Sequence, residues 1–170
     1  MITQTNRLII RPFTEQDCDA LYLMNSNPAM LKYIPTAAFT SREQAVELFH
    51  QVIQADYQQH GFGRWAVEHK ADKRVIGFCG PKFIPEFNEV ELGYRYFPEY
   101  WGTGIGTEAA SAALAEFKRF GIEQTIALIL EGNLGSEGVA KRVGMHWREQ
   151  NKFMGHKVNI YAKTLCYAKK

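Results

Sequence analysis

Three glycines spaced by one residue give the sequence its clearest chemical feature. They lie in Gly102-Thr103-Gly104-Ile105-Gly106-Thr107, directly before a stretch whose apolar residues follow helical periodicity. Glycines at a helix start leave the first-turn amides uncovered, so a phosphate group can approach the N–H groups and the positive helix end. The segment predicts an anion-binding loop, although a tight strand-to-helix turn without a ligand would use the same residues.

Two common nucleotide-binding patterns do not match this loop. The spacing is G-x-G-x-G rather than G-x-G-x-x-G, and no acidic residue follows about 20 positions later at the end of a second strand. A Gly-Lys-Ser/Thr sequence is also absent from the chain. The sequence therefore favours a phosphate-bearing cofactor of another kind.

The elements that position the loop can be predicted from periodicity and turn residues. We expect an opening strand over 5–13, and helix starts at Thr14 with Asp17 and at Ser41 with Gln44. An antiparallel meander should occupy 62–96, with turns at 70–73 and 85–88. Beyond the loop we expect a helix over 107–120, a strand over 124–130 parallel to the one ending near Tyr96, a short helix over 136–143, and a hairpin of 147–154 and 156–167.

Composition limits the classes of protein that fit. The 170 residues are 46% hydrophobic and 22% charged with a formal net charge of +2, which suits one soluble domain and neither disorder nor a polyanion-coating protein. The longest apolar runs, of five residues, are far below the roughly 20 that span a membrane, and no secretory segment opens the chain. We therefore expect no membrane partner and no direct nucleic-acid binding.

The cysteines and histidines show no metal-binding spacing. Cys18, Cys79 and Cys166 form no C-x-x-C and cannot all pair within one chain, which indicates a reducing compartment, by default the cytoplasm. The histidines show no H-x-x-x-H spacing, so we predict no metal site.

Three further stretches make the pattern specific to a family. They are Glu91-Leu92-Gly93-Tyr94, then Pro98-Glu99-Tyr100-Trp101-Gly102-Thr103-Gly104-Ile105-Gly106-Thr107-Glu108-Ala109, and Asn133-Leu134-Gly135-Ser136. Together they resemble the acetyl-CoA motif of the GNAT N-acetyltransferases, whose element order also matches. The opening 6–12 and the closing 158–162 resemble the ribosomal-protein N-terminal acetyltransferases of RimJ/RimL type, so the likeness covers almost the whole chain.

The resemblance implies a fold and a cofactor site. The fold would be a single α+β GNAT domain over 1–170, with a mixed central sheet of about seven strands, splayed parallel strands 4 and 5, and four helices. Acetyl-CoA would lie between the splayed strands, its pantetheine pairing with the first strand as an added strand would. The residues implied in cofactor binding are Tyr94, Arg95, Tyr96, Trp101, Gly102, Thr103, Gly104, Ile105, Gly106, Thr107, Asn133 and Ser136.

The same resemblance suggests two catalytic residues. Glu91 would take the proton of the amine directly or through water, with a solvated strand carboxylate as the alternative, because Glu89 points to the same face. Many relatives carry a tyrosine acid seven residues after the cleft asparagine, and Ala140 stands there. Ser136 is then the candidate acid for the departing thiolate, and its alternative role is the N-cap of a short helix.

The sequence thus predicts direct transfer of an acetyl group from acetyl-CoA to a primary amine in a ternary complex. The favoured acceptor is a protein N-terminal α-amine; the alternatives are a small amine, amino acid or polyamine, or a non-catalytic acyl-CoA sensor. Lys157 and the net charge favour an acidic acceptor over a polycation such as spermidine. Aromatic residues, among them Tyr33 and Phe153, should partly line an acceptor groove between the early helices and the last hairpin. A homodimer is possible.

Overall fold

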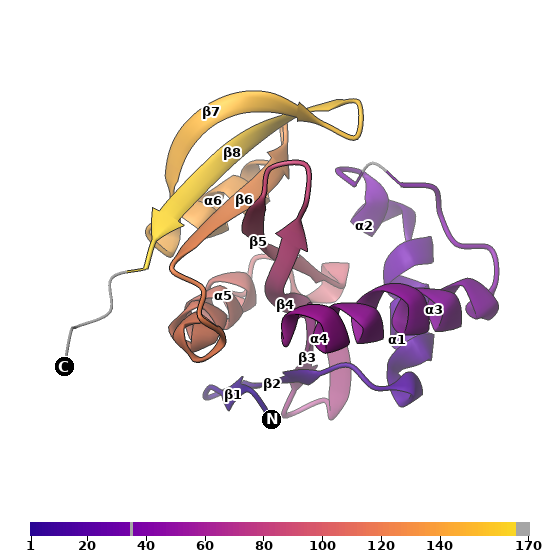
Figure 1. Ribbon diagram of the computed structural model, residues 1–170. Helices are drawn as coiled ribbons and strands as arrows, with labels where there is room; N and C mark the ends of the chain where they lie inside the picture. Colours follow the sequence, from indigo (N-terminus) through magenta and orange to yellow (C-terminus); the bar gives the residue numbers. More distant parts are fainter. Residues whose placement is uncertain (35, 166–170) are drawn as a thin grey trace.

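The protein folds around one mixed β-sheet flanked by helices (Figure 1). The computed structural model describes residues 1–34 and 36–165, and the described residues form an eight-stranded sheet in the order β1-β2-β3-β4-β5-β6-β8-β7. The strands are β1 (Thr3–Gln4), β2 (Leu8–Pro12), β3 (Trp65–His69), β4 (Arg74–Ile84), β5 (Glu89–Tyr96), β6 (Gln124–Leu130), β7 (His146–Phe153) and β8 (His156–Thr164). The helices are α1 (Cys18–Ser26), α2 (Pro28–Leu31), α3 (Arg42–Leu48), α4 (Gln54–His60), α5 (Ile105–Glu116) and α6 (Leu134–Arg142).

The predicted α+β GNAT architecture is confirmed, with one more strand than the seven expected. The additional strand, β1, lies just before the predicted opening strand 5–13, whose first residues form a turn instead of a strand. Thr5 N–H donates to Leu8 O at 2.9 Å, and Leu8 N–H donates to Thr5 Oγ1 at 3.0 Å. This turn folds β1 back antiparallel to β2, with Thr3 opposite Ile10.

The early helices begin at the predicted capping boxes but are less regular than expected. Thr14 with Asp17, and Ser41 with Gln44, form both reciprocal bonds of a capping box. The first box opens a 3-10 turn, Glu15–Asp17, before α1 begins. The second helix is divided by a π-helical segment, Phe49–Ile53, which links α3 to α4. Helix α4 then ends at Gly61, which has a left-handed conformation.

The meander β3-β4-β5 is confirmed, and it carries the strand that matters most for the site. The β4–β5 ladder runs from Gly77 opposite Tyr96 to Ile84 opposite Glu89. On its other edge β5 pairs in parallel with β6 at one position, Glu91 opposite Ile126. The two strands therefore splay beyond Glu91, as the resemblance implied.

The second half of the chain follows the predicted order with shifted boundaries. Helix α5 begins at Ile105 rather than 107, because left-handed Gly104 (φ +81°) is its N-cap. Helix α6 begins at Leu134 rather than Ser136, with Asn133 as its N-cap. The hairpin β7–β8 is present; the end of its predicted second strand, 166–167, and Cys166 lie outside the described residues.

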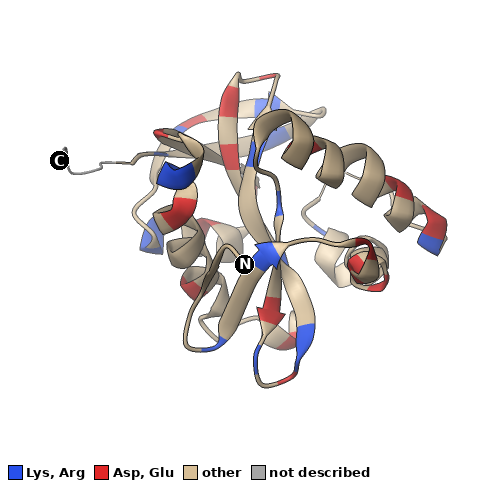
Figure 2. Ribbon diagram, turned by 60° about the horizontal axis from the view of Figure 1, so that its bottom comes forward, with Lys and Arg blue, Asp and Glu red and all other residues tan. Residues whose placement is uncertain are grey.

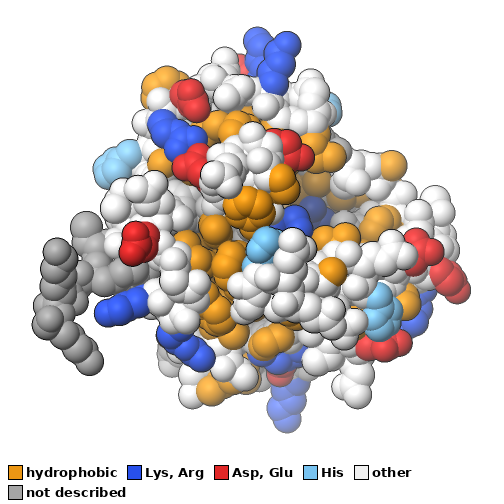
Figure 3. All heavy atoms as spheres, viewed as in Figure 1, with side chains coloured by type: hydrophobic (Ala, Val, Ile, Leu, Met, Phe, Trp, Pro, Cys, Tyr) orange, Lys and Arg blue, Asp and Glu red, His pale blue; other side chains and the backbone are white. Residues whose placement is uncertain are grey.

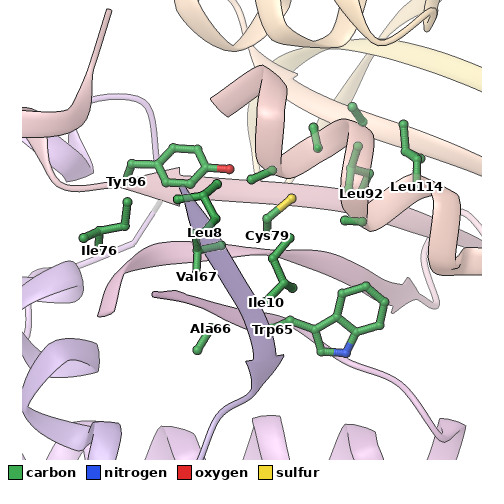
Figure 4. Close-up of a cluster of buried hydrophobic side chains, with 14 of the residues drawn as sticks. Leu8, Ile10, Trp65, Ala66, Val67, Ile76, Cys79, Leu92, Tyr96 and Leu114 are labelled. Atoms are coloured by element: carbon green, nitrogen blue, oxygen red, sulfur yellow. The ribbon is translucent and has the colours of Figure 1, made fainter. Parts of the chain in front are cut away.

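The two faces of the sheet are covered by different helices, α1 to α4 on one side and α5 with α6 on the other (Figure 1). Between the sheet and α5 lies a dense core in which Leu8, Trp65, Leu92 and Leu114 are buried (Figure 4). Acidic and basic residues are interspersed along the elements (Figure 2). None of the described helices is long and apolar enough to span a membrane. The sheet thus provides a rigid frame between two helical layers.

Candidate active site

The glycine loop is shaped by its backbone angles. Gly102 and Gly104 have φ values of +70° and +81°, a region that costs other residues about 1–2 kcal/mol. A Cβ added at Gly102 would contact no protein atom within 4 Å, and one at Gly104 would meet the Arg7 guanidinium at 3.6 Å. Conformation rather than protein packing therefore requires glycine here, and the turn aims the first amides of α5 away from the protein.

A clamp from the N-terminal strands fixes this loop. The Arg7 guanidinium donates to Thr103 O at 3.0 Å and to Glu108 Oε2 at 2.7 Å, and Thr5 Oγ1 donates to Glu108 Oε1 at 2.5 Å. Partial burial favours the neutral form of Glu108, but the hydrogen bonds from Thr5 and Arg7 outweigh it and lower its pKa. The ionised clamp thus ties the first turn of α5 to β2.

Every second residue of β5 turns its backbone N–H and C=O groups away from β4, toward the edge that faces β6. Phe97 N–H donates to Ile76 O at 2.9 Å, so Phe97 and, by alternation, Arg95 turn their backbone groups toward β4. Tyr94 and Tyr96 turn theirs to the splayed edge, where the Trp101 indole donates to Tyr96 O at 2.8 Å. Of the three strand residues expected to pair with a cofactor, Arg95 therefore has its backbone groups turned toward β4 and away from the cofactor side. Tyr94 has the best-placed N–H and C=O.

A cavity of about 190 Å³ opens where β5 and β6 splay. Its walls include the predicted residues Glu91, Tyr94, Asn133 and Ser136. Tyr33 and Phe153, two of the aromatic residues expected at an acceptor groove, also line it. A separate, more open hollow of about 410 Å³ near α1, α2 and Phe97 contains none of the predicted site residues.

Glu91 is buried and paired, unlike the solvated alternative. It is 7% exposed, and its carboxylate accepts a hydrogen bond from Arg64 Nη2. Glu89, on the same face of β5, instead forms a bidentate pair with Arg148 at 2.8–2.9 Å. Only Glu91 among the acidic residues described here lines the cavity.

Comparisons with known proteins agree with this geometry. Residues 7–146 match the family described as "Acetyltransferase (GNAT) domain". The chain belongs to the GNAT acetyltransferase family. It is 30% identical over 145 residues to the "Uncharacterized N-acetyltransferase YoaA" of Bacillus subtilis (strain 168), covering 84% of this chain and 81% of that protein.

Two solved structures share the fold of this acetyltransferase. One is RimL, a ribosomal L7/L12 alpha-N-protein acetyltransferase in complex with coenzyme A, with a TM-score of 0.78, 21% identity, and coverage of 96% and 97% of the two chains. The other is spermidine N-acetyltransferase from Vibrio cholerae in complex with CoA and spermine, with a TM-score of 0.78, 18% identity, and coverage of 94% and 96%. These two structures show the shared fold, whereas the family match and the likeness to YoaA show that the protein is an acetyl-CoA-dependent N-acetyltransferase rather than a non-catalytic sensor.

Around Ser136 the acetyltransferase differs from the expected local structure. Asn133 Oδ1 accepts from Ser136 N at 3.2 Å, which makes Asn133 the cap and places Ser136 in the first turn of α6. The N-cap alternative for Ser136 is therefore wrong, because the helix starts two residues earlier than the pattern suggested. Tyr94 Oη donates to Ser136 O at 2.6 Å, and burial raises the pKa of Tyr94 well above its usual value, so this hydroxyl stays protonated.

Sequence reasoning missed Arg64, and it expected Arg95 to contact the cofactor through its backbone. Both side chains line the cavity, and Phe78 lies under both guanidinium groups at 5.6 and 5.2 Å. No motif marks Arg64, because its partner Glu91 is 27 positions away on another strand. Within the described ranges, no group of His, Cys, Asp and Glu could hold a metal ion.

Proposed function

We propose that this acetyltransferase acetylates protein N-terminal α-amines, as enzymes of RimJ/RimL type do. The observation that carries the proposal is the charge of the cavity, which is lined by one carboxylate, Glu91, and by two guanidinium groups. Glu91 is paired with Arg64, and the second guanidinium group is that of Arg95. An α-amine, with a pKa of about 7.7–8.0, is neutral in roughly one molecule in ten at pH 7, whereas a lysine-like amine near 10.4 is neutral in fewer than one in a thousand. A site with a single paired carboxylate suits the first kind of amine.

The cofactor side of the proposal uses backbone groups. The amides from Gly102 to Gly106 and the N-terminal end of α5 bind the pyrophosphate, with Trp101, Thr103, Ile105 and Thr107 completing the loop. Tyr94 and Tyr96 present N–H groups to the pantetheine arm, and Asn133 lies beside it at the start of α6.

The chemical step needs three groups. Glu91 accepts a proton from the amine, directly or through water, and the neutral nitrogen attacks the thioester carbonyl. A strand amide at Tyr94 stabilises the developing oxyanion. The carbon–sulfur bond then breaks as the nitrogen loses its second proton to water. The Ser136 hydroxyl donates a proton to the departing thiolate and regains one from water.

Direct transfer without a covalent enzyme intermediate is supported by the cysteines. Cys18 and Cys79 are the free thiols of the described residues, and both are buried. Burial raises the pKa of Cys79 to about 12, so this thiol is a poor nucleophile. Unpaired thiols also fit the proposed cytoplasmic location.

An acceptor panel tests the proposal. Purified protein is incubated with acetyl-CoA and a peptide with a free N-terminus, the same peptide with a blocked N-terminus and an internal lysine, or spermidine. Thiol release is followed, and mass spectrometry locates the acetyl group. We expect acetylation of the free N-terminus alone; turnover restricted to spermidine or to the lysine would contradict the proposal.

A further inference from the structure

Arg95 is a largely buried cation whose contacts within the protein leave its charge uncompensated. Its Nη1 donates to Met24 O at 3.2 Å and to Asn25 Oδ1 at 3.0 Å, both neutral acceptors. Its Nε is buried and has no hydrogen-bond partner, and no carboxylate of the described residues forms an ion pair with it. Burying a charge and a donor without partners is unfavourable, so a partner from outside the chain would relieve a real cost.

The surroundings of Arg95 add to this positive charge. The Arg64 guanidinium lies 5.6 Å from the centroid of the same Phe78 ring, and among the described residues its anionic partner is Glu91. Lys82 is the cross-strand partner of Glu91 and so faces the same side of the sheet, but Asp56 neutralises it at 2.6 Å. The cavity is thus lined by two guanidinium groups and one carboxylate, which leaves a surplus of one positive charge.

Burial makes it less favourable for the Arg95 guanidinium to carry its charge. Desolvation, with a smaller contribution from Arg64, lowers the pKa of its guanidinium to about 10. In Figure 3, basic atoms are set back among hydrophobic side chains near the middle of the face. A hydrophobic surrounding strengthens any ion pair formed there, because water screens it less.

We propose that Arg95 binds a carboxylate of the acceptor, carried a few bonds from the amine that Glu91 deprotonates. This inference rests on the proposed transfer to an amine and names the acceptor's second functional group. Glu91 and Arg95 both line the cavity, so an acceptor bound there can contact the two side chains together. Lys157 suggested an acidic acceptor from the sequence, but it does not line the cavity, whereas Arg95 does.

Two sources could supply this carboxylate. It is either the side chain of an acidic first residue of a peptide or the α-carboxylate of a free amino acid. In both, a charge-assisted hydrogen bond from the Arg95 guanidinium would hold the carboxylate at a limited distance from the amine. A polyamine would instead bring a second positive charge to Arg95 and is disfavoured.

Matched acceptor pairs measure the preference directly. The first pair is a peptide beginning with Asp and the same peptide beginning with Asn; the second is free alanine and alanine amide. We expect kcat/KM to favour the carboxylate in at least one pair by about 10- to 100-fold, the range of a charge-assisted hydrogen bond. A preference in the first pair assigns the carboxylate to a side chain, and one in the second assigns it to a free amino acid.

Variants connect the preference to Arg95. In Arg95→Met, the two acceptors of the pair that shows the preference should have kcat/KM values within about twofold of each other. Arg95→Lys keeps the positive charge and should retain part of the preference. Arg119→Met is the matched control, because Arg119 pairs with Glu116 and does not line the cavity. Should Arg95→Met fail to fold, Asn25→Asp places a carboxylate beside Arg95 Nη1 and should remove the preference in the same way.

The outcomes separate this inference from the proposed function. Equal kcat/KM within both pairs, or a preference that survives in Arg95→Met and Asn25→Asp, overturns the carboxylate site while leaving N-terminal acetylation intact. Preference for alanine over its amide, with no peptide acetylated, keeps the carboxylate site and overturns the N-terminal acceptor. Turnover of spermidine alone overturns both.

Discussion

The glycine loop after β5 and the cavity beside β5 are two halves of one site that are built in different ways. The loop binds through backbone N–H groups made accessible by Gly102 and Gly104, whose φ values are positive. The acceptor side of the cavity presents side chains, with Arg64 next to β3 and with Glu91 and Arg95 on β5. Within the family a backbone site of this kind suits a constant cofactor, whereas side chains from separate elements can change with the acceptor.

This difference also predicts how the halves respond to mutation. Changes in the loop should alter cofactor affinity with little effect on the choice of acceptor. Changes in the cavity should alter turnover and acceptor choice with little effect on cofactor affinity. Four substitutions examine this division.

The largest effect is expected for Glu91→Gln. The amide keeps the shape and can still accept from Arg64, but it cannot take a proton. We expect kcat/KM for an N-terminal peptide to fall by roughly 10² to 10⁴ at pH 6–7. The loss should shrink above pH 8, because the α-amine, with a pKa of about 7.7–8.0, is then mostly neutral without a base. A pH series for wild type and variant checks this; a deficit that stays constant through pH 9 would remove Glu91 as the base.

Gly104→Ala should weaken CoA binding by about tenfold or more. Its positive φ disfavours a side chain by about 1–2 kcal/mol, and the added Cβ projects where the phosphate approaches the amides. Gly121→Ala is the matched control, since Gly121 has φ +71° and equally open surroundings but follows the other end of the α5 segment. Calorimetry with CoA should find normal affinity in the control, and equal losses in both variants would mean that backbone strain alone is responsible.

Ser136→Ala should slow the chemical step by about tenfold, at the lower end of what proton transfer contributes. Cofactor affinity should stay within a few-fold, because the hydroxyl acts in the transition state and the backbone N–H of Ser136 still binds Asn133. Tyr94→Phe provides the comparison, since it removes the hydrogen bond to Ser136 O and leaves the serine hydroxyl in place. Single-turnover kinetics decide the matter: an unchanged rate in Ser136→Ala would reduce the serine to a structural residue.

The smallest effect is expected for Arg7→Met, which removes the clamp on Thr103 O and Glu108. Because the clamp positions the loop without forming it, CoA affinity should fall by about three- to fivefold and kcat should change little. Arg119→Met again serves as control, as Arg119 Nη1 also binds an N-terminal carbonyl, Ile2 O, at 2.9 Å. A tenfold or larger loss of kcat in Arg7→Met would show that the clamp also affects the acceptor half of the site and contradict the division.

Local patterns explain how much could be predicted from the sequence. The glycine loop, the capping boxes at Thr14 and Ser41, and the meander turns are each encoded within a few neighbouring residues, and the structure contains all of them. Helix boundaries were less accurate, because Asn133 and Gly104 cap their helices three residues before the patterns begin. The acceptor side could not be predicted, since Arg64 meets Glu91 only after β3, β4 and β5 have paired.

The central claim is that the loop binds the pyrophosphate of acetyl-CoA, whereas Glu91 and the basic side chains of the cavity act on the acceptor. Calorimetric titration of CoA into wild type, Gly104→Ala and Glu91→Gln tests it most directly. We predict that affinity falls at least tenfold in Gly104→Ala and stays within about twofold of wild type in Glu91→Gln. Wild-type affinity in Gly104→Ala, or a comparable loss in Glu91→Gln, would contradict the division of the site into these two halves.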